Sequence, residues 1–239
     1  MSKLKLGELR VLKQAGLKKY LLDDTVLQHL NNLSSVGDEH LACQQWLLGN
    51  PAKRYIFDLL YDDLLGKKRD GRSVLDVGGG LTAIARALEL SVYHLIDIMA
   101  HDDPETTQRF LDSLKSEIWV GSDWATHNCD VHYDVIVAND LFPNVDQRLE
   151  MFLDRFLPFC DEMRLLLTFY PEQRAYRVKR TDADEIMTLL AWDERFLTTV
   201  LSKYAVRMQE GWTRNLSASE DSLFENGRRV AVLRLSLIH

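Results

Sequence analysis

Three consecutive glycines follow a short apolar run and an aspartate, in the segment VLDVGGG at residues 74–80. The apolar run 73–77 is typical of a buried parallel strand, and Thr82–Leu90 has the pattern of a helix. A strand that enters a helix through a tight turn directs backbone N–H groups into the crevice at the end of the strand. Glycines let a ligand approach those groups closely. The sequence therefore predicts a ligand site at Gly78–Gly80.

A second acid stands about 20 positions further along the chain. Asp97 follows Val92–Ile96, which is the next predicted strand. A carboxylate at this position is placed to accept hydrogen bonds from both ribose hydroxyls of an adenosine-containing ligand. The glycine turn and Asp97 together therefore indicate a ligand that contains adenosine.

The glycine turn fits two kinds of ligand. Gly78, Gly80 and Ala83 satisfy the looser form of the dinucleotide fingerprint, in which alanine replaces the third glycine. Asp76, however, places a carboxylate where a diphosphate would be repelled. S-adenosylmethionine carries no phosphate, and its ammonium and sulfonium groups are positive. The aspartate therefore favours S-adenosylmethionine over a dinucleotide.

At this point the sequence resembles the Rossmann-like (class I) S-adenosylmethionine-dependent methyltransferase superfamily. VLDVGGG resembles its first motif, and HLIDI at 94–98 resembles its second. GSDW at 121–124 resembles the turn after the third strand, and YDVIVANDLFPNV at 133–145 resembles the fourth-strand motif. The resemblance covers about residues 52–239 and identifies no particular member.

The resemblance implies S-adenosylmethionine as cofactor and assigns roles to individual residues. Asp97 is then the ribose acid, Asp123 meets the adenine amino group, and Trp124 supplies a backbone N–H or a packing surface. The loop that follows the fourth strand borders the methyl group. The implied cofactor-binding residues are Asp76, Gly78, Gly79, Gly80, Asp97, Ile98, Asp123, Trp124 and Asn139.

The predicted catalytic residues are Asn139, Asp140 and His101. Methyl transfer is an in-line displacement, so orientation of the acceptor supplies much of the acceleration. Asn139 and Asp140 follow the fourth strand, where either would orient an acceptor and Asp140 would take its proton. The alternative is that they cap the loop before the predicted helix 145–157. His101 is a further candidate base beyond the second strand. No acidic cluster suits a metal ion, so we predict none.

Strands and helices alternate after residue 72, which predicts an α/β fold with a doubly wound, mostly parallel sheet. The resemblance implies seven strands with an antiparallel strand at the C-terminus. Asn226-Gly227 is a hairpin signal before the last strand. We expect this strand to pair antiparallel with either 223–225 or 204–209. The predicted strands are 73–77, 92–96, 117–120, 133–138, 163–169 and 230–238, and the later predicted helices are 104–115, 145–157 and 182–190, the last capped by Thr181 or Asp182.

Residues 1–66 have apolar positions at helical spacing throughout. We therefore predict an N-terminal helical extension at 1–50, which forms a lid or an acceptor-site wall, and a methyltransferase domain at 51–239.

Composition narrows the function further. The 239 residues carry a net charge of −7, which disfavours extended nucleic acid as a partner. The sequence contains no apolar run of membrane-spanning length and no signal-peptide core, so we expect a cytoplasmic protein without a membrane span. The three cysteines, Cys43, Cys129 and Cys160, lie far apart in the sequence. The pattern leaves the oligomeric state open.

The favoured function is thus O- or N-methylation of a small or medium-sized acceptor, such as a sugar, a metabolite or a natural-product intermediate. Two alternatives stay open. One is a non-catalytic module that keeps the fold and binds a cofactor or a partner, and the other is an NAD-dependent oxidoreductase.

Overall fold

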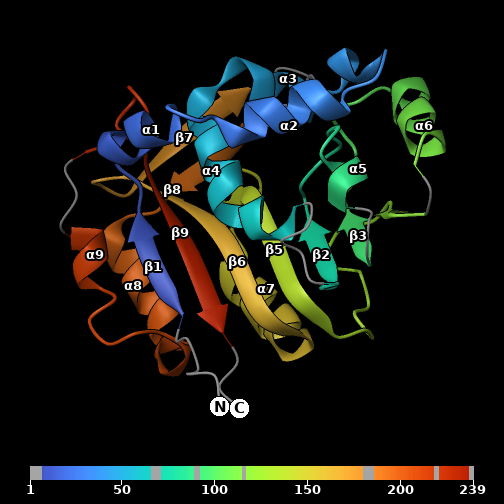
Figure 1. Cartoon of the computed structure of the whole chain (residues 1–239). Coiled ribbons are helices and arrows are strands. Elements are labelled where there is room, and N and C mark those ends of the chain that lie inside the picture. Colours follow the sequence, from blue (N-terminus) through green and yellow to red (C-terminus); the bar gives the residue numbers. More distant parts are fainter. Residues whose placement is uncertain are drawn as a thin grey trace.

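The computed structural model describes residues 7–65, 71–88, 92–114, 117–179, 186–217 and 221–236 (Figure 1). Seven strands form one sheet in the order β1-β9-β6-β5-β2-β3-β4, and β7 and β8 form a separate pair. The strands are β1 (Glu8–Val11), β2 (Val74–Val77), β3 (Tyr93–Ile96), β4 (Trp119–Val120), β5 (Tyr133–Phe142), β6 (Cys160–Phe169), β7 (Arg174–Lys179), β8 (Ile186–Ala191) and β9 (Arg229–Ser236).

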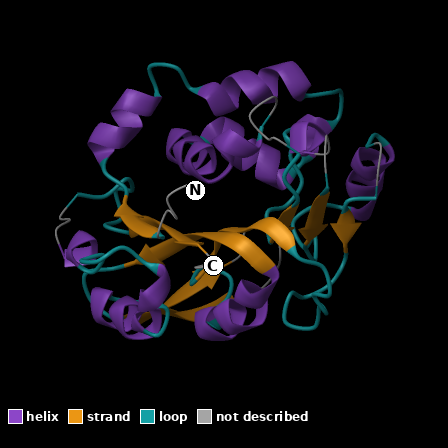
Figure 2. Ribbon diagram, turned by 60° about the horizontal axis from the view of Figure 1, so that its bottom comes forward, coloured by secondary structure: helices purple, strands orange, loops and turns teal. Residues whose placement is uncertain are grey.

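Helices cover both faces of the sheet, as Figure 2 shows. The α-helices are α1 (Gln14–Tyr20), α2 (Thr25–Leu33), α3 (Ala42–Gly49), α4 (Pro51–Tyr61), α5 (Ala85–Leu88), α6 (Pro104–Asp112), α7 (Leu149–Phe156), α8 (Glu194–Ser202) and α9 (Arg214–Ser217). No described helix is long and apolar enough to cross a membrane.

Two hydrophobic cores follow from this layering. Side chains of β9 alternate between them, because successive residues of a strand point to opposite faces. Ala231 and Leu233 join the core that contains Phe152 of α7, whereas Val230 and Val232 join the core beneath the N-terminal helices. The predicted doubly wound α/β fold, with its mostly parallel sheet and antiparallel last strand, is therefore confirmed.

The outer partner of the last strand differs from both predicted alternatives. β9 pairs antiparallel with β6 on one side and with β1 on the other, where Glu8 faces Arg234. The prediction of helix throughout residues 1–66 is therefore wrong at 8–11. Leu9 and Val11 are buried while Glu8 and Arg10 are exposed, which is the alternation of a sheet strand.

The predicted helix 182–190 is also wrong over its described residues, 186–190. Residues 186–191 form β8, which pairs antiparallel with β7. Leu189 and Ala191 are buried while their neighbour Leu190 is exposed, so pairing and packing override helix propensity. The predicted cap at Thr181 or Asp182 lies outside the described residues.

Several predicted boundaries also change. Of the predicted helix Thr82–Leu90, the α-helical part is Ala85–Leu88, and residues 89–91 lie outside the described part of the chain. The predicted helix 145–157 starts later, at Leu149. β5 continues through Asn139 and Asp140 to Phe142, with an irregularity between Ala138 and Phe142.

Candidate cofactor site

The predicted glycine turn connects β2 to the segment before α5. Gly78 and Gly80 have φ angles of +73° and +65°, a region that favours glycine. A Cβ atom on Gly80 would lie 2.1 Å from Sγ of Cys43, and one on Gly79 would lie 2.4 Å from Oδ1 of Asp76. Side chains at these positions would therefore collide with α3 above the turn or with β2 below it.

Asp97 joins this turn to the end of β3. Its Oδ2 accepts a hydrogen bond from the backbone N–H of Gly80 (3.0 Å), and its Oδ1 accepts one from Met99 (2.7 Å). The indole of Trp119 donates to its carbonyl oxygen (2.7 Å). These bonds fix the carboxylate at the carboxyl edge of two adjacent parallel strands, where the sequence predicted a ribose acid.

Asp76 lies behind the turn and does not line the cavity in front of it. The hydroxyls of Tyr61 and Tyr93 donate to its Oδ2 at 2.9 and 3.0 Å. Its Oδ1 is buried and, within the described residues, accepts no hydrogen bond. Burial raises the pKa of Asp76 to about 7. In this structure the side chain supports the turn, and direct cofactor contact stays a prediction.

The raised pKa of Asp76 predicts a pH-dependent stability. Between its ordinary pKa of 3.8 and about 7, the folded protein holds a proton that the unfolded chain releases. Stability from this group is therefore present below about pH 4 and is lost as pH rises to 7, by at most about 1.4 kcal/mol per pH unit. Urea denaturation of the wild type and of Asp76→Asn between pH 4 and 8 measures how the free energy of unfolding depends on pH in each protein. The contributions of other carboxyl groups cancel when the free energy of unfolding of one protein is subtracted from that of the other. If this difference stays constant from pH 4 to 8, the pKa of Asp76 is not raised.

A cavity of about 530 Å³ opens between the carboxyl ends of β2, β3 and β5 and the helices α3 and α4. The position agrees with the general rule for ligand sites in open α/β sheets. Apart from Asp76, all of the predicted site residues line this cavity: Gly78, Gly79, Gly80, Asp97, Ile98, His101, Asp123, Trp124, Asn139 and Asp140.

Asp123 and Trp124 form one wall of the cavity, and both have structural contacts. Oδ1 of Asp123 accepts from the N–H of Ala125 (2.9 Å), which closes a local turn. Trp124 is buried against an aromatic cluster that includes Phe152, and its indole donates to Oδ2 of Asp146 (3.0 Å). Trp124 is thus a core residue that also reaches the cavity.

Asn139 and Asp140 lie where β5 becomes irregular, and Asp140 has a φ of +58°. The amide of Asn144 donates to Oδ1 of Asp140 (2.7 Å), and Nζ of Lys53 lies 3.4 Å from its Oδ2. The carboxylate is therefore held between β5 and the N-terminal helices. His101 lies edge-on to Trp46, with ring centroids 4.9 Å apart.

Helix α3 is hydrogen-bonded to the segment that follows the glycine turn and to the loop that follows β3. Oε1 of Gln44 accepts from the N–H of Ala83 (2.8 Å), and the N–H of Ala42 donates to Oδ1 of Asp102 (2.7 Å). Cys43, Trp46 and Lys53 line the cavity from this side. The sequence did not reveal these residues. Within a helical pattern, Lys53 looks like an ordinary surface residue and Trp46 like an ordinary core residue.

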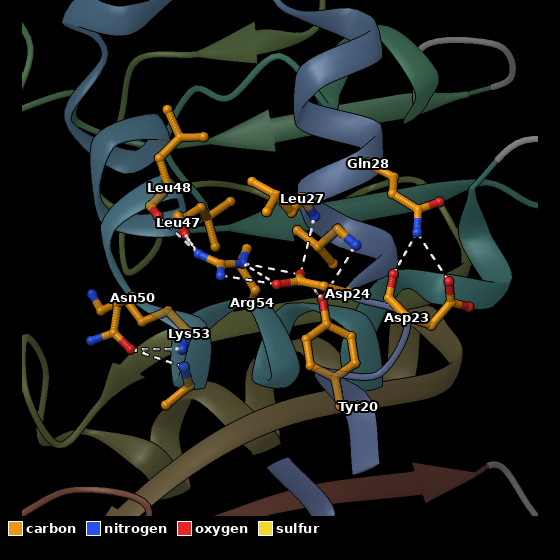
Figure 3. Close-up of polar contacts among 12 residues, drawn as sticks. Tyr20, Asp23, Asp24, Leu27, Gln28, Leu47, Leu48, Asn50, Lys53 and Arg54 are labelled. Carbon is orange, nitrogen blue, oxygen red and sulfur yellow. Dashed lines mark hydrogen bonds and ion pairs between the residues drawn. The ribbon is translucent and has the colours of Figure 1, made fainter. Parts of the chain in front are cut away.

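A buried arginine holds three of these helices together (Figure 3). The guanidinium of Arg54 in α4 bonds to both carboxylate oxygens of Asp24, at the start of α2 (2.9–3.0 Å). It also donates to the carbonyls of Leu47 and Leu48 at the end of α3, both at 2.8 Å. Tyr20 donates a further bond to Asp24 (2.8 Å). The wall that carries Lys53 is thereby fixed.

No group of three or more His, Cys, Asp or Glu side chains that could hold a metal ion gathers among residues placed by the structure.

Comparisons with known proteins agree with this architecture. No family model matches the sequence, and no curated protein matches it significantly. Among solved structures, the chain is similar to coclaurine N-methyltransferase bound to N-methylheliamine and S-adenosylhomocysteine, with a TM-score of 0.51 and 14% identity over 93% of this chain and 92% of that one. It is also similar to the 1,6-didemethyltoxoflavin-N1-methyltransferase of Burkholderia thailandensis, with a TM-score of 0.49 and 15% identity over 95% and 92%. The protein therefore has the Rossmann-like fold of the class I S-adenosylmethionine-dependent methyltransferases.

Proposed function

We propose that this protein is an S-adenosylmethionine-dependent methyltransferase that acts on a small acceptor. The observation that carries the proposal is the Asp97 carboxylate, which lines the cavity and is bonded to the N–H groups of Gly80 and Met99. Each carboxylate oxygen has a second lone pair, so it can also accept from a ribose hydroxyl.

The residues present fit this cofactor. Gly78–Gly80 line the cavity without side chains of their own, and Ile98, which is 58% exposed, offers an apolar surface for an adenine ring. Asp97 and Asp102 make this part of the cavity acidic, which suits a cationic ligand better than a diphosphate. When bound, S-adenosylmethionine supplies a methyl carbon that is activated by the sulfonium.

Asn139 and Asp140 are the proposed acceptor-orienting residues. Asn144 and Lys53 hold the Asp140 carboxylate at the cavity wall, where it would accept a proton from a hydroxyl or ammonium acceptor. His101 lines the same cavity and remains a second candidate base. The helices within residues 1–50 would then form the acceptor-site wall, because α3 contributes Trp46 and Leu47 to the lining. The likeness to coclaurine N-methyltransferase, whose structure holds N-methylheliamine, supports a small acceptor.

Replacing Asp97 with alanine is expected to weaken binding of S-adenosylhomocysteine by about 1–3 kcal/mol, because the ribose and the N–H groups of Gly80 and Met99 lose their acceptor. Titration calorimetry measures the affinity. Asp112→Ala, on the exposed side of α6, is a matched control that should bind as the wild type does. Unchanged affinity in Asp97→Ala would remove this residue from the site.

Two further measurements separate the alternatives. If the protein binds NAD but not S-adenosylhomocysteine, it is not a methyltransferase. If it binds the cofactor but transfers no labelled methyl group to any small molecule of a cell extract, the result favours a non-catalytic module with the same fold.

A further inference from the structure

An arginine lines the cavity from the turn that precedes β9. The guanidinium of Arg228 lies over the ring of Phe224, 3.8 Å from its centroid, and both residues line the cavity. Phe224 and Arg228 belong to one tight turn, in which the N–H of Gly227 donates to the carbonyl of Phe224 (3.2 Å). This stacking restrains the guanidinium and covers one of its faces.

Other cations of the same cavity have acidic partners. Lys53 lies 3.4 Å from Asp140, and the guanidinium of Arg148 bonds to Asp146. Within the described part of the chain, by contrast, neither a carboxylate nor a carbonyl accepts from the guanidinium of Arg228, and its Nε is buried without a hydrogen-bond partner. Among the residues that the structure describes, the two Nη atoms of Arg228 have no acceptor either, and a ligand in the cavity can supply one.

We infer that Arg228 binds an oxyanion of the methyl acceptor, either a carboxylate or a phosphate. A guanidinium whose face is covered presents its edge, and this edge matches the two oxygens of such a group. The inference rests on the proposed function, because it names the substrate class of the same site.

Ligand-observed NMR with three small probes tests the inference. Benzoate and phenyl phosphate carry the two candidate oxyanions, and benzamide is a neutral counterpart. Each is titrated at millimolar concentration, with and without S-adenosylhomocysteine. We expect at least one anion to bind the wild type, benzamide to bind at least about tenfold more weakly, and Arg228→Gln to lose at least about tenfold in anion affinity. The anion that binds better distinguishes a carboxylate acceptor from a phosphate acceptor.

Arg174→Gln is the matched control. Arg174 also lies over an aromatic ring, that of Tyr170 at 5.6 Å, but it does not line the cavity. We expect this variant to bind the anions as the wild type does, and both variants to keep the melting temperature and the affinity for S-adenosylhomocysteine.

Three results would overturn the inference: no anion binding to the wild type, equal binding of benzamide, or full anion binding to Arg228→Gln. Anion binding that depends on Arg228 in a protein that fails to bind S-adenosylhomocysteine would instead contradict the proposed methyltransferase and leave the oxyanion site in place.

Discussion

Replacing Arg54 with methionine is expected to lower the free energy of unfolding by about 3–5 kcal/mol, the range for breaking a buried ion pair at one partner. Methionine fills much of the space but leaves the carboxylate of Asp24 and the carbonyls of Leu47 and Leu48 without the bonds they have now. Because these groups belong to α2 and α3, the cavity wall should loosen as well. Urea denaturation monitored by circular dichroism measures the change.

Arg109→Met provides the contrast for this prediction. Arg109 also pairs with an acid, Glu105 at 3.3 Å, but both side chains are exposed on α6. An exposed pair one helical turn apart contributes about 0.2–0.5 kcal/mol. Similar losses in Arg54→Met and Arg109→Met would mean that burial does not determine the strength of the Arg54 cluster.

A Gly80→Ala variant is expected to lose about 2–5 kcal/mol of stability and its measurable affinity for S-adenosylhomocysteine. The φ of +65° disfavours alanine by about 1–2 kcal/mol, and the new methyl group, 2.1 Å from Sγ of Cys43, forces α3 or the turn to move at a further cost of about 1–3 kcal/mol. Either movement disturbs the Gly80 N–H bond to Asp97. Denaturation and titration calorimetry measure the two effects.

Gly227→Ala separates the two causes of this loss. Gly227 has a φ of +76°, and among the described residues no atom lies within 4 Å of where its Cβ would be. This variant should therefore show the backbone cost alone. Adding Cys43→Ala to Gly80→Ala should restore part of the stability, because Sγ is the closest atom. Equal losses in Gly80→Ala and Gly227→Ala would show that the contact with α3 is unimportant.

The central part of the fold was predictable because its signals are local. The strand, turn and helix around Gly78–Gly80, the acid at Asp97 and the strand that contains Asn139 each occupy one short segment, and parallel strands bring their carboxyl ends to one edge. The predicted site residues therefore meet in one cavity, with Asp76 behind it. Only the packing shows that two tyrosines bond to Asp76, since Tyr61 comes from α4 and Tyr93 from β3, on separate segments of the chain.

The remaining parts depend on long-range pairing. A strand of four residues such as Glu8–Val11 shows too few alternations to be distinguished from a helical turn, and its identity follows from its partner β9. The amino acids at 186–191 suit either a helix or a strand. The segment is a strand because it pairs with β7. Lys53 and Arg228 likewise reach the cavity through tertiary packing, which leaves no pattern in the sequence.

The pairing of β1 with β9 also constrains the order in which the protein can assemble. Glu8 faces Arg234, so β1, which comes first among the described strands, pairs with β9, which comes last among them. During synthesis β1 is made before β9, so its apolar side chains Leu9 and Val11 cannot take their places in the sheet until β9 has been made. The edge of the sheet is therefore completed late, and the nascent chain must keep an unpaired strand from associating elsewhere until then.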